Sequence, residues 1–160
     1  MSQVSLIRST RFSAGHRYWR PEWSVERNRA TFGASANPHG HNYRLEVTVR
    51  GRVDPETGFC VSLAILDRAL ETVVERLDQQ EIGEALPEFA PGRRIPTTEE
   101  LARWLFHDLE GRIPGPALLE RVRLEESESL AAEYTPGEVG ASPDPGSSAA
   151  VGGSATGDSP

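Results

Sequence analysis

The sequence predicts an α+β fold with an antiparallel sheet, in one domain of residues 1–134. The chain has 160 residues, enough for a single domain with a hydrophobic core. Segments with strand-like alternation lie at both ends of this domain, and two segments with helical periodicity lie between them. The order strand–strand–helix–helix–strand–strand lacks the regular alternation of a parallel α/β fold and therefore favours an antiparallel sheet.

Four strands are expected from alternation. In the clearest of them, Leu45, Val47 and Val49 alternate with polar residues, and the turn sequence DPETG follows. Val122 and Leu124 give the third strand the same period of two. The expected strands cover residues 4–12, 43–53, 120–128 and 130–134.

Two helices are expected between the second and third strands. Residues 62–78 carry apolar side chains three and four residues apart, the spacing of one helix face. Residues 97–112 begin with a capping box, in which Thr97 and Glu100 satisfy free amide groups of the first turn. A loop rich in proline and glycine separates the two segments.

Composition excludes several classes of function. The net charge of −7 and the pI near 5.1 oppose binding to nucleic acid or to an anionic membrane. We expect a cytoplasmic protein, because no apolar run is long enough to span a bilayer and the N-terminus lacks a signal peptide's apolar core. Cys60 is the single cysteine, which excludes an internal disulfide and a cysteine-rich zinc site. All 17 basic residues are arginine, which excludes Schiff-base chemistry on lysine.

Residues 135–160 differ in composition from the rest of the chain. They are mainly Gly, Ser, Ala and Pro, with few apolar side chains. Such a segment buries too little surface to offset the entropy lost on ordering. We therefore predict a disordered tail after the domain.

The stretch NPHGHNY, residues 37–43, holds the best candidate for a functional site. Because residues i and i+2 of a strand face the same side, His39 and His41 would project together. His16 lies just past the first expected strand, and an antiparallel neighbour would bring it alongside. Three imidazoles with a fourth position open are the arrangement of a catalytic zinc site. The alternative is a polar strand end, and His107 is interpreted as an ordinary helix residue.

Further motifs accompany the histidines in a fixed order. They are RFSAGHR, the stretch from NRATFG through NPHGHNY to DPETG, SLAILDRAL, LDQQEI, PTTEELARWLFHDL and RVRLEES. Together they resemble the 6-pyruvoyl-tetrahydropterin synthase and 6-carboxy-tetrahydropterin synthase family. The resemblance covers residues 4–134 in one register with few gaps, which makes it far more specific than the histidine pair alone.

The resemblance implies the tunnelling fold, in which subunits join their sheets into a barrel-shaped trimer and two trimers form a hexamer. It also implies that His16, His39 and His41 bind Zn²⁺. By the same resemblance, Glu126 holds the ring of a pterin substrate at a subunit interface, since a carboxylate accepts two parallel N–H bonds. Without the resemblance, Glu126 would be interpreted as an ordinary charged residue on the surface of a strand.

The resemblance places three further residues, Thr97, Thr98 and Glu99, along the pterin pocket. Helix capping alone already explains the two threonines. The choice between capping and substrate binding therefore depends on the structure around the start of the second helix.

Two positions depart from the family pattern. Where the family has a cysteine shortly before HGH, this chain has Ser35, whose hydroxyl stays protonated at neutral pH. Where the family has an Asp-His pair, Asp78 is followed by Gln79, which cannot relay a proton. Asp78, together with Ser35, is therefore the candidate for proton transfer. Cys60 is interpreted as a small buried thiol of the core.

These observations favour a zinc-dependent lyase acting on 7,8-dihydroneopterin triphosphate or a related pterin, as in tetrahydrobiopterin or queuosine biosynthesis. The complete histidine triad and Glu126 support this interpretation. Two alternatives stay open at this point. One is retro-aldol cleavage of a dihydropterin side chain, and the other, which Ser35 and Gln79 favour, is a zinc- and pterin-binding homologue without turnover.

Overall fold

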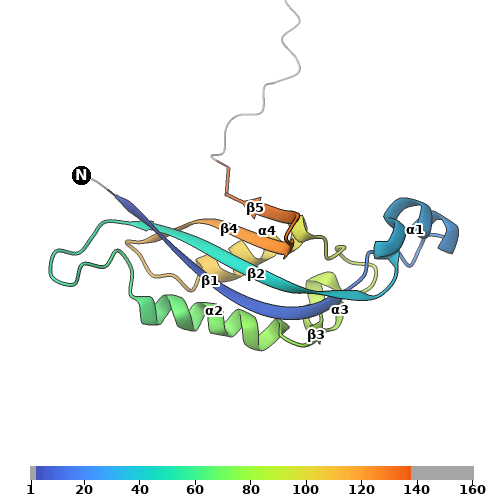
Figure 1. Cartoon of the computed structure of the whole chain (residues 1–160), viewed down its shortest axis with the longest axis horizontal. Coiled ribbons are helices and arrows are strands. Elements are labelled where there is room, and N and C mark those ends of the chain that lie inside the picture. The colour runs from blue at the N-terminus through green and yellow to red at the C-terminus, as the bar shows by residue number, and fades with distance from the viewer. Residues whose placement is uncertain (1–2, 138–160) are drawn as a thin grey trace, which may run out of the picture.

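A five-stranded sheet carries the fold, with two long helices packed against it (Figure 1). The structure is a computed structural model and describes residues 3–137. Its elements are β1 (Val4–His16), α1 (Val25–Phe32), the 3₁₀ turn η1 (Gly33–Ala36), β2 (His39–Gly51), α2 (Leu63–Leu77), β3 (Gln80–Glu81), α3 (Ile82–Ala85), the 3₁₀ turn η2 (Pro87–Phe89), α4 (Thr98–Glu110), β4 (Leu118–Ser127) and β5 (Leu130–Tyr134).

The strand order is β3-β1-β2-β4-β5. The predicted α+β class and the order of the six long elements are confirmed. The sheet is antiparallel as predicted except at one edge, where the two-residue β3 lies parallel to β1. This short strand follows α2 directly, so the helix acts as the crossover that a parallel pair needs.

The first strand is longer than expected and ends at His16 rather than Phe12. Its last four residues, SAGH, stay in register with β2, so that His16 pairs with His39. Serine, alanine and glycine carry no strand signal of their own. The pairing with β2 therefore decides where β1 ends.

The hydrophobic core lies between one face of the sheet and the helices α2 and α4. In β2, the alternate residues Tyr43, Leu45, Val47 and Val49 are fully buried, as a strand with one covered face requires. Helix α2 packs against β1, whereas α4 packs against β4 and β5. The helical faces add further core residues, namely Leu66, Leu70, Val73, Leu77, Leu101, Leu105 and Leu109.

The opposite face of the sheet carries a network of ion pairs. Arg44 of β2 lies 3.4 Å from Glu46 on its own strand and 3.6 Å from Glu125 on β4. Arg123 joins Glu125 at 3.1 Å to Glu133 of β5 at 3.7 Å. Alternation along each strand thus separates an apolar face from a charged one.

Helix α1 is an element that hydrophobic periodicity does not predict. Asn28 is its one buried residue, and it is fully buried. The Asn28 side chain accepts a hydrogen bond from the Arg20 amide at 2.8 Å and donates one to the Arg20 carbonyl at 2.9 Å. The polar contacts of Asn28 and the stacking of Phe32 on Trp23, with ring centroids 5.8 Å apart, together hold the helix at the end of the sheet where β2 begins (Figure 1).

The predicted tail lies almost wholly outside the described residues, which end at residue 137. Residues 135–137 have no regular secondary structure. Among the helices of residues 3–137, none combines the length and the apolar character that a bilayer crossing demands.

Candidate metal centre

The two longest strands bring three histidines together at one end of the sheet. His16 and His39 are direct partners in the β1–β2 ladder, and His41 faces the same side two residues along β2. The ring centroid of His16 lies 4.5 Å from that of His39 and 5.1 Å from that of His41. The centroids of His39 and His41 are 5.0 Å apart. The antiparallel arrangement expected from the sequence produces this cluster.

Hydrogen bonds fix the tautomers of two of the imidazoles. Nδ1 of His16 lies 2.8 Å from the carbonyl oxygen of Pro96, and Nδ1 of His39 lies 2.8 Å from that of Asn37. A carbonyl can only accept, so each Nδ1 carries the proton and each Nε2 keeps its lone pair. Both rings therefore offer Nε2 to a metal.

Burial favours the neutral form of His16. The residue is fully buried, and loss of solvent lowers the pKa of its imidazole, an effect that the Pro96 carbonyl partly opposes. The neighbouring His39 and His41 lower this pKa further. Neutral imidazole is the form that binds a metal ion.

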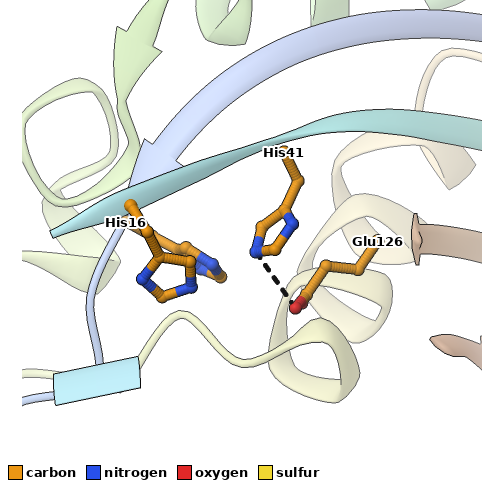
Figure 2. Close-up of side chains that lie close together, drawn as sticks. His16, His41 and Glu126 are labelled. Carbon is orange, nitrogen blue, oxygen red and sulfur yellow. Dashed lines mark ion pairs between the residues drawn. The ribbon is translucent and has the colours of Figure 1, made fainter. Parts of the chain in front are cut away.

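Glu126 of β4 joins the histidine cluster (Figure 2). Its Oε1 lies 3.1 Å from Nε2 of His41, but that nitrogen, which is buried, has no hydrogen-bond partner among the described residues. The ligand atoms of His16, His39, His41 and Glu126 all lie within 4.8 Å of one another. Three imidazoles and a carboxylate are a donor set that suits Zn²⁺, and the unpartnered nitrogen is explained if a metal is its partner.

The residues predicted to line the pterin pocket separate into three roles. Thr98 is buried and its hydroxyl donates a hydrogen bond to Oε2 of Glu126. Thr97 is the N-cap of α4, and its hydroxyl accepts from the Glu100 amide at 3.3 Å. Glu99 is exposed. The structure thus brings Thr98 against the predicted ring-binding carboxylate, and Thr97 has the capping role.

The two predicted proton-transfer residues lie outside the four-residue cluster. Asp78 ends α2, and its Oδ1 accepts from the Ser13 amide at 2.8 Å, while the Gln79 amide donates to the Ser13 carbonyl at 2.6 Å. Ser35 is half-buried in η1, and its carbonyl accepts from the Tyr18 amide at 2.8 Å. Asp78 and Ser35 therefore flank the cluster from two different turns.

Tyr18 is a site residue that the sequence analysis does not identify. Its ring meets those of His16 and His39 edge-on, with centroids 5.2 and 6.3 Å apart. Burial and, to a lesser extent, the nearby Glu126 raise the pKa of its hydroxyl to about 12. An aromatic residue two positions after a ligand is a weak signal, since such residues are common beside strands.

Cys60 lies far from the cluster. It packs beside Gly51, the last residue of β2, whereas His39 is the first residue of this 13-residue strand. The two ends of such a strand are separated by about 40 Å. Cys60 is partly buried against the core, consistent with its interpretation as a core thiol, and cannot act at this chain's own histidines. His107 lies on α4, exposed and 3.6 Å from Glu110.

Comparison with known proteins agrees with this geometry. The family model of 6-pyruvoyl tetrahydropterin synthase matches residues 5–137. The chain is 35% identical over 135 residues to the 6-pyruvoyl tetrahydrobiopterin synthase of Pongo abelii, a match that covers 82% of this chain and 91% of that protein. It is 28% identical over 95 residues to the dihydroneopterin monophosphate aldolase of Pyrococcus furiosus, over 59% of this chain and 75% of that protein.

Solved structures identify the fold. The 6-pyruvoyl tetrahydropterin synthase of Caenorhabditis elegans matches with a TM-score of 0.79 and 31% identity, over 86% of this chain and 98% of that chain. The synthase of Plasmodium vivax matches with a TM-score of 0.59 at 16% identity, which supports the fold alone. The fold is the tunnelling fold of these synthases, and the relatives support a pterin-processing lyase. The chain belongs to the 6-pyruvoyl tetrahydropterin synthase family.

Proposed function

We propose that the protein is a zinc-dependent lyase acting on 7,8-dihydroneopterin triphosphate or a related dihydropterin. The observation that carries this proposal is the convergence of His16, His39 and His41 from two paired strands beside the buried carboxylate of Glu126. A solvated polar strand end would not hold two imidazoles by carbonyl hydrogen bonds and leave a third with a buried, unpartnered nitrogen.

The family resemblance and the contacts of each site residue together suggest its role. His16, His39 and His41 would hold Zn²⁺, which when bound polarises oxygens of the substrate side chain. Glu126 would accept N–H bonds from the pterin ring, and the Thr98 hydroxyl orients its carboxylate. The His16–Pro96 hydrogen bond fixes the rotation and the tautomer of that imidazole, and burial favours its neutral form.

Proton transfer is assigned to Asp78, assisted by Ser35. The Asp78 carboxylate is held through Oδ1 by the Ser13 amide, which leaves Oδ2 to accept a proton from substrate. The Ser35 hydroxyl can donate and accept a hydrogen bond but does not ionise near neutral pH. This weaker acid–base pair distinguishes the chain from the family pattern of cysteine and histidine.

A second candidate is retro-aldol removal of the dihydropterin side chain. The absence of the thiol and the imidazole at positions 35 and 79 favours it, and a relative of the chain is named as a dihydroneopterin monophosphate aldolase. The metal would again stabilise negative charge on a side-chain oxygen. The two candidates therefore share a site and differ in product.

We infer that the protein assembles into a homo-hexamer of two barrel-shaped trimers. Support comes from the sheet, because β5 is an edge strand and, within residues 3–137, Val4 to Phe12 of β1 have no strand beside them on the side away from β2. Ile7 and Leu130, on these two strands, are about half exposed. Unpaired edges of this kind are suited to pairing with another chain. Light scattering should give six times the 17.5 kDa of one chain.

Turnover of 7,8-dihydroneopterin triphosphate by the zinc-loaded protein tests the function, with products identified by mass. A 6-pyruvoyl or 6-carboxy product supports the first candidate, and a 6-hydroxymethyl product supports the second. Tight pterin binding without any product would refute both and leave a binding protein. His39→Ala is the control, and it should lose both the bound metal and the activity, with about one metal ion per chain in the parent.

Restoring the family pattern is a sharper test of the changed positions. Ser35→Cys with Gln79→His should raise 6-pyruvoyl formation, because the pair supplies a thiolate and an imidazole. The backbone at Gln79 has φ of 59°, a left-handed conformation that histidine adopts more readily than most residues. No gain in rate would mean that these two residues do not limit the synthase reaction in this chain.

A further inference from the structure

Glu126 contacts two groups whose roles differ. Its Oε2 accepts a hydrogen bond from Thr98, at the start of α4, and its Oε1 lies 3.1 Å from Nε2 of His41 (Figure 2). Yet Nε2 of His41 is buried and has no hydrogen-bond partner within residues 3–137. The short distance therefore occurs without the alignment that a hydrogen bond requires.

This combination of proximity and misalignment is the geometry of two metal ligands. In a hydrogen bond the donor points at the acceptor, whereas two ligands point at a third position between them. Donor atoms about 2.05 Å from a tetrahedral Zn²⁺ lie roughly 3.3 Å from each other. The observed 3.1 Å is close to that spacing, and Glu126 lies within the same 4.8 Å cluster as the three imidazoles.

The burial of Glu126 supports the same interpretation. Its side chain is 9% exposed, and a buried carboxylate requires a compensating positive charge. A divalent cation shared by His41 and Glu126 supplies the charge and satisfies both atoms.

We propose that Glu126 is an exchangeable fourth ligand, bound to the metal in the resting protein and transferred to the pterin ring when substrate binds. This rests on the proposed function, which assigns ring binding to Glu126. A site with four protein ligands is closed, so ring binding would open the coordination position that the substrate side chain needs. The metal thereby becomes reactive only when a pterin ring is in place.

The side chain can make this exchange with little movement. The terminal torsion of glutamate is broad and roughly two-fold, so the carboxylate can turn Oε1 away from the metal while the rest of the side chain stays in place. Both oxygens move in that rotation, and the hydroxyl of Thr98, which donates to Oε2, can rotate with them.

Azide binding to the Co²⁺-substituted protein tests the proposal, with visible absorption as the readout. Azide needs an open coordination position, so it should bind the resting protein at least tenfold more weakly than it binds Glu126→Gln. Addition of unsubstituted pterin, which has the ring but no side chain to reach the metal, should tighten azide binding to the wild type by a similar factor. Glu125→Gln, on the charged face of the same strand, is the matched control and should behave as wild type.

Two results would overturn the exchange. Azide binding to the resting wild type as tightly as to Glu126→Gln would show that no fourth protein ligand is present. Pterin binding that leaves azide affinity unchanged would show that ring and metal do not share Glu126; the proposed function would survive that outcome. Failure of pterin to bind the metal-loaded wild type would instead refute the ring site, and with it both proposals. The wild-type comparison needs no variant, so it holds even if Glu126→Gln does not fold.

Discussion

Substitution of Gly40 by alanine tests how closely the two histidine-bearing strands approach. A Cβ atom at Gly40 would lie 3.1 Å from the carbonyl oxygen of Ala14 and 3.6 Å from the Cα of Gly15, both backbone atoms of the neighbouring strand. Backbone cannot rotate away as a side chain can, so the strands must separate by a few tenths of an ångström. Overpacking of this kind costs about 1–2 kcal/mol.

The matched control is Gly111→Ala, at the end of α4. No atom lies within 4 Å of a Cβ built there, and its φ of −72° suits any residue. That variant should be neutral or gain about 0.5 kcal/mol from the unfolded state. The two variants should therefore differ by about 2 kcal/mol, or about 8 °C in the melting temperature of the metal-free protein.

Metal affinity supplies a second measurement for Gly40→Ala. His39 and His41 flank the substituted residue, and His16 follows the Gly15 that it approaches. Strand separation should therefore weaken Zn²⁺ binding about tenfold in a calorimetric titration, the scale of a disturbed ligand shell. Equal melting temperatures for the two alanine variants, or unchanged zinc affinity, would refute the close strand contact on which this reasoning depends.

Three further predictions concern stability. Leu105→Ala, at a fully buried position of α4, should lower the free energy of unfolding by about 2–5 kcal/mol, measured with denaturant. Leu118→Ala, at a 63% exposed position, should change it by no more than about 0.5 kcal/mol. Similar losses in the two variants would contradict the core assignment. Thr97→Ala removes the hydrogen bond to the Glu100 amide and should cost about 1 kcal/mol, and Thr97→Ser should restore most of it. Burial, and to a lesser extent the charge of Glu84, raise the pKa of Glu81, so its charged form destabilises the fold at neutral pH. This penalty disappears below about pH 4, where the carboxyl group is protonated in both the folded and the unfolded state. Glu81→Gln should therefore raise the melting temperature at pH 7 but not at pH 4, and a rise at both pH values would show that charge is not the cause.

Local patterns predict the histidine cluster but not the groups that complete it. Alternation places His39 and His41 on one face, and antiparallel pairing supplies His16. The carbonyl of Pro96, which fixes the tautomer of His16, comes from a loop 80 residues away in the sequence. Backbone acceptors have no residue-type signature, so only the fold can reveal them.

The burial of Glu126 can be predicted from the alternation of its strand, although the acidic residues around it suggest an exposed position. Taken as part of the acidic stretch EESE, it is interpreted as surface charge. The alternation that buries Val122 and Leu124 continues to Glu126 and places it on the covered face. Period two along a strand is therefore better evidence of burial here than the polarity of the residue itself.

Helix α1 lacked a usable signal because its one buried residue is polar. That residue is Asn28, whose side chain forms hydrogen bonds with the backbone of Arg20. Ser24, which accepts from the Arg27 amide at 3.2 Å, is a conventional N-cap. A cap without an apolar stripe gives little reason to predict a helix, because most helical stability comes from tertiary packing.

The division of the site between strands and turns has a consequence for substitution. His16, His39, His41 and Glu126 stand on strands that also build the core. Positions 35 and 79, where this chain departs from its family, lie in η1 and in the turn after α2, at half-buried and exposed sites. Such sites accept substitution at little cost in stability. Substitutions at the proposed acid–base positions are therefore expected to leave the histidine cluster and Glu126 in place.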